Sequence, residues 1–328
     1  MKTFLFTLVL SLYILNSYAQ TKNENPKKLF REFWEWVDKN YIFFNSKSID
    51  WNMIYTKYEN KINDNTPEDQ LFAIMDSAVL ELKDGHSLLI KPNKIGSQYN
   101  FRSGYEIHFN HNMVKKNYVT DSLGSSGNLY WAILENNIGY VYLPQFNKYG
   151  EFFNVFKLMK EKNVSRLIID VRGNGGGNSN LVPELLGVLV KNKTLLGYYT
   201  EKTGPGHSDI IKPIGIYATP NANLCFDIPV SVLINRSCYS ATTYFAAMIK
   251  GLPNVTLIGQ TTGGGAGGHL GYQLSNGFQI RVSVSDFLDK NGLTTENGVE
   301  PDIFIENTRD DLLSGRDKML ETAMRLIY

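Results

Sequence analysis

The sequence contains few cysteines, few histidines and almost no net charge. Its 328 residues include two cysteines and five histidines, and the formal net charge is +1 at pH 7. A net charge this close to zero argues against a nucleic-acid partner, which would require a basic stripe. The two cysteines, Cys225 and Cys238, permit at most one disulfide. Their spacing does not establish that the Cα atoms approach closely enough, so two buried thiols are favoured over a disulfide.

Long hydrophobic runs are also missing, except at the N-terminus. Lys2 precedes an apolar run from Phe4 to about Leu15, and small residues then occupy positions 17 and 19. This layout predicts a signal peptide over residues 1–19, cleaved after Ala19. The alternative is an uncleaved membrane anchor, for which the run is short. We therefore expect a secreted or periplasmic protein with no membrane span after cleavage.

The remaining chain has an ordinary globular composition, with 43% apolar and 20% charged residues. Apolar residues recur at helical spacing between residues 25 and 83. We predict an N-terminal helical domain over 20–83, a connecting strand and loop region over 84–127, and an α/β core over 128–328. Thr66 is the expected N-cap of a helix over 67–82.

Strand and helix signals alternate in the second half of the chain. Short apolar runs typical of buried strands are followed by amphipathic segments, which predicts a mixed, largely parallel sheet with flanking helices. The expected strands cover 129–134, 138–143, 167–171, 230–234 and 255–258, and the expected helices cover 149–162, 180–190, 240–250 and 310–327. A hairpin turn is expected over 274–278.

A glycine-rich segment follows the predicted strand at 167–171. It reads Asp170-Val-Arg172-Gly-Asn174-Gly-Gly-Gly177 and precedes a predicted helix. Consecutive glycines let the backbone approach a ligand and turn its N–H groups outward, which suits an anion or a developing oxyanion. A plain tight turn is the alternative. A phosphate loop is a weaker one, because no Lys-Ser or Lys-Thr pair follows.

Three further segments carry candidate catalytic groups. Ser240 lies between a predicted buried strand and a helix, which is the position of a nucleophile elbow but also of a helix N-cap. His86, in the turn Asp84-Gly85-His86, could serve as its general base. Glu296 and Glu300 are both candidates for the acid that would orient this base.

Together these motifs resemble the tail-specific (C-terminal processing) protease and tricorn-core serine peptidase family. The resemblance runs from about residue 80 to the end, and the motifs follow the family's order. They are Asp84-Gly-His86, Asp170-x-Arg-x-Asn-Gly-Gly-Gly177, Ser240-Ala-Thr242, the glycine-rich 259–268 and Gly298-Val-Glu-Pro-Asp302. The resemblance implies a crotonase-like peptidase core. It also implies that Ser240 is the nucleophile, with an oxyanion hole formed by the N–H of Ala241 and that of Gly176 or Gly177.

The chain departs from the tail-specific branch of this family in two respects. That branch uses a catalytic Lys in a Phe-Gly-Lys-Gly motif, whereas residues 262–267 read Thr-Gly-Gly-Gly-Ala-Gly. Resemblance to the tricorn-like branch instead implies a triad of Ser240, His86 and Glu296. Glu296 is preferred because Glu300 adjoins the Pro-Asp motif. The segment between His86 and residue 129 is also too short for a full PDZ domain.

The sequence therefore predicts an exported serine peptidase that hydrolyses peptides or unfolded proteins through an acyl-enzyme on Ser240. Neither a metal nor an organic cofactor is implied. The alternative is a binding or carrier protein on the same fold, without catalysis, whose ligand would be a peptide or a hydrophobic molecule.

Overall fold

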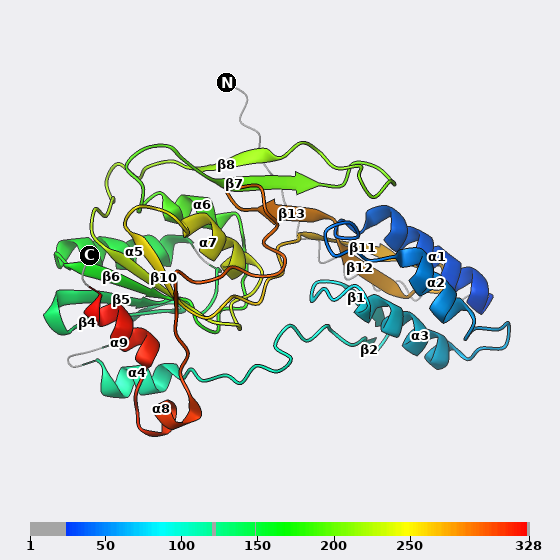
Figure 1. Cartoon of the computed structure of the whole chain (residues 1–328), viewed down its shortest axis with the longest axis horizontal. Helices are drawn as coiled ribbons and strands as arrows, with labels where there is room; N and C mark the ends of the chain where they lie inside the picture. Colours follow the sequence, from blue (N-terminus) through cyan, green and yellow to red (C-terminus); the bar gives the residue numbers. More distant parts are fainter. Residues whose placement is uncertain (1–23, 120–122, 148, 327–328) are drawn as a thin grey trace.

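The computed structural model describes residues 24–119, 123–147 and 149–326. The predicted signal peptide lies outside these residues. Figure 1 shows two bodies side by side, a helical region formed by the start of the chain and an α/β core that contains the C-terminal helices. None of the helices in these ranges is long and apolar enough to cross a membrane.

Three helices form the N-terminal region: α1 (Pro26–Asn40), α2 (Trp51–Glu59) and α3 (Glu68–Leu80). The side chain of Asn25 caps α1 by accepting from two backbone N–H groups, and Asp50 caps α2. The expected cap of α3 was wrong. Pro67 occupies the N-cap position with no side-chain hydrogen bond, and Thr66 instead bonds within the preceding turn.

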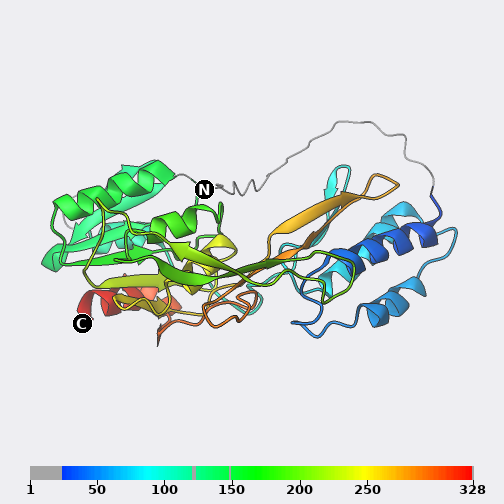
Figure 2. The same cartoon turned by 90° about the horizontal axis from the view of Figure 1, so that it is seen from above.

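These helices cover a four-stranded sheet to which a distant segment of the chain contributes half of the strands. Its order is β11-β12-β1-β2. The bounds are β1 Leu88–Lys91, β2 Lys94–Ile95, β11 His269–Gln273 and β12 Gln279–Ser283. The predicted hairpin turn joins β11 to β12, with the N–H of Leu274 donating to the carbonyl of Phe278. Figure 2 shows this hairpin against the helices, and the buried apolar side chains of its turn and of β12 belong to the hydrophobic cluster of the helices.

The core is a seven-stranded sheet in the order β14-β10-β9-β6-β5-β4-β3. Its strands are β3 Gly124–Ser126, β4 Leu129–Leu134, β5 Ile138–Tyr142, β6 Arg166–Asp170, β9 Val230–Ile234, β10 Val255–Gly259 and β14 Ile303–Phe304. A short 3-10 turn, Glu135–Asn137, joins β4 to β5. All pairs from β14 to β5 are parallel, whereas β4 and β3 are antiparallel. This confirms the predicted mixed, largely parallel sheet.

Alternating residues of the central strands point to opposite faces of the sheet. A hydrophobic cluster lies on each face, and helices cover both clusters. One face is covered by α5 (Tyr149–Glu161), α6 (Leu181–Leu186) and α7 (Ala241–Ile249). The other is covered by α4 (His111–Asn117) and α9 (Lys318–Arg325). The single helix expected over 310–327 was wrong. Gly315, with φ of +73°, separates α9 from α8 (Arg309–Leu313).

A third, three-stranded sheet bridges the two bodies. Its strands are β7 (Thr194–Glu201), β8 (Ile214–Ala218) and β13 (Ser285–Leu288), in the order β13-β7-β8. Figure 1 shows β7 and β8 extending from the core toward the N-terminal helices. At the end of this hairpin, Nε2 of His207 lies 2.9 Å from Oδ1 of Asp38 on α1, and its ring stacks on Phe44. The hairpin therefore holds the helical region against the core.

Candidate active site

The glycine-rich loop after β6 is anchored by a fully buried ion-pair network. Nε and Nη2 of Arg172 donate to the two carboxylate oxygens of Asp170 at 2.9 and 2.7 Å, and Nη1 donates to Asp317 at 2.8 Å. Burial disfavours the charged guanidinium, but the two carboxylates raise the pKa of Arg172 well above its ordinary value. The network fixes the start of the loop to the N-cap of α9.

Asn174 then shapes the loop itself. Its side-chain amide donates to the carbonyl of Leu143 at 2.9 Å, and its side-chain oxygen accepts from the N–H of Gly176 at 2.8 Å. Its backbone carbonyl accepts from the N–H of Tyr239 at 3.1 Å. Asn174 therefore holds the glycine-rich loop beside the segment that precedes Ser240.

Gly176 is the point at which the two loops touch. A Cβ atom at this position would lie 2.8 Å from Cβ of Ser240 and 3.0 Å from the backbone nitrogen of Ala241, and φ is +109°. Any residue with a side chain would clash here, and its backbone would be strained. The structure thus brings together Ser240, Ala241 and Gly176, as the sequence led us to expect.

Ser240 connects β9 to α7 in a strained conformation, with φ of 55° and ψ of −125°. Its N–H donates to the carbonyl of Gly264 at 2.9 Å, which holds the turn in place. Ser240 occupies the N-cap position of α7, and its carbonyl accepts from the N–H of Tyr244, but its hydroxyl makes no capping hydrogen bond. Strain of this kind persists where surrounding structure enforces it, commonly at functional sites.

The backbone N–H groups around Ser240 differ in their availability. That of Gly176 is engaged by Asn174. Within the described ranges, the N–H groups of Ala241 and Gly177 donate no hydrogen bond to the protein. Of the two glycines predicted as alternative oxyanion donors, Gly177 therefore has the free N–H, while Gly176 provides the close contact.

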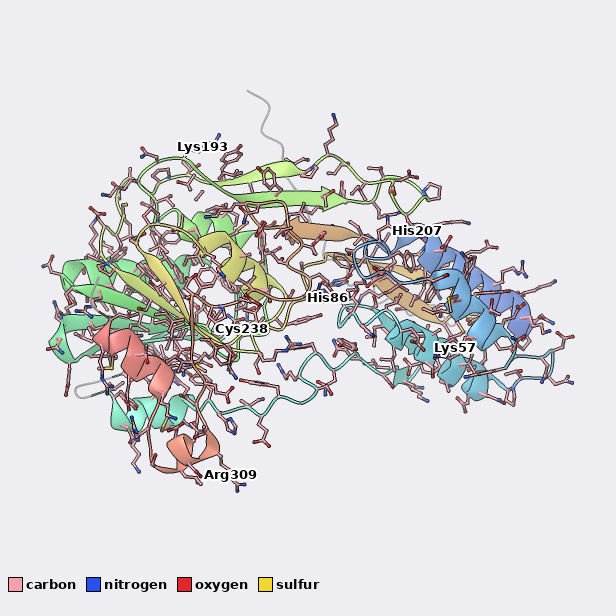
Figure 3. The ribbon with its side chains drawn as sticks, in the orientation of Figure 1. Lys57, His86, Lys193, His207, Cys238 and Arg309 are labelled. Carbon is pink, nitrogen blue, oxygen red and sulfur yellow. The ribbon has the colours of Figure 1, made fainter. Side chains whose placement is uncertain are left out.

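His86 lies at the junction between the helical region and the core (Figure 3). Its ring centroid is 5.1 Å from that of Tyr239, the residue before Ser240, and 5.5 Å from that of His269. Nδ1 is buried and has no hydrogen-bond partner among the described residues. Burial lowers the pKa of His86, and the opposing field of Asp84 does not restore it. At neutral pH the imidazole is therefore uncharged, which is the form that a general base requires.

The turn that carries His86 is held by Asp84. The carboxylate of Asp84 accepts from the backbone N–H of His86 and from the hydroxyls of Ser87 and Ser283, each at 2.8 Å. Arg281 on β12 donates to the carbonyl of His86 at 2.9 Å. The backbone of the turn is thus fixed to β12, in the sheet of the N-terminal region.

Glu296 is buried, with 6% of its surface exposed, whereas Glu300 is exposed. Its Oε2 accepts from the N–H of Ala266 and its Oε1 from Nζ of Lys47, each at 2.8 Å. Burial and the nearby Asp84 raise the pKa of Glu296 to about 8, although Lys47 acts in the opposite direction. The structure places no hydrogen bond between Glu296 and His86. The expected orientation of His86 by Glu296 is therefore not formed in this conformation.

Two residues of the site were missed at the sequence level. Tyr239 stacks on Phe101 at 4.0 Å between centroids, and its hydroxyl lies against Gly85. Its position directly before Ser240 could have suggested a role. Lys47 comes from the connection between α1 and α2, and nothing in the local sequence distinguishes it from a surface lysine.

A cavity of about 800 Å³ opens beside these residues, between the helical region and the core. Lys47, Phe101, Tyr239, Gly265 and Glu296 contribute to its wall. The described residues include no group of three or more His, Cys, Asp or Glu side chains that could hold a metal ion. Both cysteines are free thiols. Cys238 is buried as predicted, whereas the prediction of burial is wrong for Cys225, which is partly exposed.

Comparison with known proteins identifies relatives along most of the chain. Residues 137–305, just over half of the chain, match peptidase family S41, and residues 22–79 match the tricorn protease C1 domain. A tricorn protease homolog of Saccharolobus solfataricus is 30% identical over 202 residues, covering 58% of this chain and 17% of the relative. The carboxy-terminal processing protease CtpB of Bacillus subtilis is 21% identical over 246 residues, covering 73% of this chain and 49% of the relative. The chain thus spans half or less of these relatives' length.

Solved structures extend the likeness to the whole described fold. A candidate peptidase from Parabacteroides merdae is 33% identical, with a TM-score of 0.84, over 92% of this chain and 96% of that one. Mature CPAF shares the fold at 11% identity, with a TM-score of 0.70, over 89% of this chain and 94% of that one. The match to the family model and the likeness to this 33% identical structure lead to one conclusion: the chain belongs to peptidase family S41.

Proposed function

We propose that this protein is an exported serine peptidase in which Ser240 attacks the peptide carbonyl. The observation that carries the proposal is the strained turn at Ser240, which is in close contact with Gly176. In the described residues the N–H of Ala241, directly after Ser240, donates no hydrogen bond to the protein. A hydroxyl at a strand-to-helix turn beside free backbone N–H groups is the arrangement that acyl transfer requires. Membership of family S41 supports the same chemistry.

In the proposed reaction, the Ser240 hydroxyl adds to the carbonyl carbon while neutral His86 accepts its proton. The negative oxygen of the tetrahedral intermediate is stabilised by the N–H groups of Ala241 and Gly177. His86 then protonates the leaving amine, the C–N bond breaks, and a water molecule releases the acyl group by the reverse sequence. Glu296 is the acid assigned to protonated His86, although no hydrogen bond joins the two side chains in the described conformation.

We propose peptides or unfolded protein segments as substrates, and we place the binding site in the cavity beside Tyr239. The cavity lies between the two bodies and has room for several side chains. The signal-like residues 1–19 support export. No step of the proposed reaction uses a metal or an organic cofactor.

The test is labelling by a fluorophosphonate, which reacts covalently with activated serines. The parent protein should label at Ser240, as identified by peptide mass spectrometry, and Ser240→Ala should not label. His86→Ala should label at least about 100-fold more slowly, because the hydroxyl loses its base. A folded parent that fails to label would support the alternative of a carrier without catalysis. Parental labelling of His86→Ala would exclude His86 as the base.

A further inference from the structure

Lys47 occupies an unusual place for a lysine. Its side chain is only 10% exposed, and it lies in the connection between α1 and α2. Figure 1 shows this connection at the end of the helical region that faces the core. An ammonium group in such surroundings requires several hydrogen-bond acceptors, because desolvation of an unpaired charge costs several kcal/mol.

The ammonium group of Lys47 has three acceptors, one for each of its protons. It donates to the carbonyl of Leu82 at 3.3 Å, to the carbonyl of Lys83 at 2.9 Å and to Oε1 of Glu296 at 2.8 Å. The two carbonyls directly precede the turn Asp84-Gly85-His86. Lys47 therefore joins the main chain that leads into His86 to the carboxylate of Glu296 in the core.

We propose that Lys47 is a positioning residue for the proposed hydrolysis: it favours the charged form of Glu296 and keeps this carboxylate close to the segment that carries His86. The inference rests on the proposed function, because it assigns a task to Lys47 only if Glu296 assists His86. Lys47 does not touch the reacting atoms. It acts on catalysis through Glu296.

The charged and titratable groups around Glu296 decide the expected pH dependence. They are Lys47 on the α1–α2 connection, Asp84 before β1, Tyr41 after α1, Tyr239 before the nucleophile and Asp286 on β13. Lys47 also lowers the pKa of Asp286, which burial raises to about 7, and that of His86. Among the groups that act on Glu296, Lys47 is the cation and favours the ionised carboxylate of Glu296, whereas the negative charge of Asp84 disfavours it. Removal of Lys47 therefore raises the pKa of Glu296 above its present value of about 8.

The experiment measures the rate constant of fluorophosphonate labelling between pH 6 and 10 in the full-length protein. In the parent, labelling should increase with pH as Glu296 ionises. In Lys47→Met, this rise should move to higher pH by about 1 to 3 units, the usual effect of losing an opposite charge at contact distance. Lys47→Arg keeps the cation and should move the rise by less than about half a unit, because the field at Glu296 is retained.

Lys39→Met is the matched control. Lys39 lies on α1, is exposed, and pairs with Glu35 at 3.6 Å away from the cavity. This variant should label with the parental pH profile. It shows that loss of a lysine ion pair in the helical region does not by itself change the site.

A double variant covers the case in which Lys47→Met fails to fold. Glu296→Gln combined with Lys47→Met removes both members of the buried pair, so no isolated charge remains. If Lys47 acts through Glu296, the double variant labels at the rate of Glu296→Gln alone. A further slowing in the double variant, or a parental pH profile in Lys47→Met, overturns the inference while Ser240 still labels. Absence of labelling in the parent would instead contradict the proposed function.

Discussion

Replacement of Gly176 by alanine gives a direct test of the site geometry. The added Cβ would lie 2.8 Å from Cβ of Ser240, 2.8 Å from the carbonyl oxygen of Tyr239 and 3.0 Å from the nitrogen of Ala241. Ordinary contacts begin near 3.4 Å, so the loops must separate by several tenths of an ångström. The nearest atoms belong to backbone or to a Cβ, and none can move away by a side-chain rotation.

Two consequences follow from this clash. Displacement of the nucleophile from the N–H groups that stabilise the oxyanion should lower kcat/KM by about 100-fold, the cost typical of a misplacement near 1 Å. The φ of +109° adds strain of about 1–3 kcal/mol in alanine, so the free energy of unfolding should also fall. Activity is measured on a fluorogenic peptide that the parent cleaves, and stability by denaturant unfolding.

Gly175→Ala is the matched control, one residue earlier in the same loop. No atom lies within 4 Å of the Cβ that it would add, and its backbone is outside the left-handed region. This variant should keep activity within about threefold of the parent, because a rate change of that size corresponds to less than 1 kcal/mol. If Gly176→Ala is as active as Gly175→Ala, the contact between the glycine-rich loop and Ser240 is not part of the catalytic site.

Two further predictions concern the core. Arg172→Met leaves the carboxylates of Asp170 and Asp317 buried without their cation, and should lower the free energy of unfolding by about 3–5 kcal/mol. Arg316→Met is the comparison: it removes an exposed partner of Glu321 and should change the free energy of unfolding by less than about 1 kcal/mol. Denaturant unfolding measures both variants. The second prediction concerns the thiols. In native protein a thiol reagent should react with at most Cys225, because Cys238 is buried and burial raises its pKa to about 12. After unfolding, two thiols per chain should react. Rapid reaction of both thiols in native protein would contradict the described packing.

The parallel core was predictable because its signals are local. Strands β6 and β9 are short apolar runs, and each is followed by a loop whose glycines or small residues permit an abrupt turn. The order of these elements is sufficient to predict parallel pairing. The same local signals placed Ser240 and the loop 170–177 at the ends of neighbouring strands, which β6–β9 pairing brings together.

Pairings between distant segments were not predictable in this way. A short apolar run identifies β1 as a strand and alternation of apolar residues identifies β12, but neither pattern specifies the partner strand. Their antiparallel pairing, with Leu89 opposite Ile280, moves the β11–β12 hairpin from the core to the helical region. The pairing of Lys47 with Glu296 could not be predicted either, because it joins residues that are far apart in the sequence.

The division of the site between two bodies has a consequence for catalysis. His86 is fixed to β12 by Arg281 and so belongs to the sheet of the helical region, whereas Ser240 belongs to the core. The distance between base and nucleophile therefore depends on how the two bodies are held together. The described polar contacts that span this junction include the His207–Asp38 pair at the end of the β7–β8 hairpin and the buried Lys47–Glu296 pair. The second pair also contains the acid assigned to His86, so the same ion pair that joins the two bodies links that acid to the main chain that leads into His86.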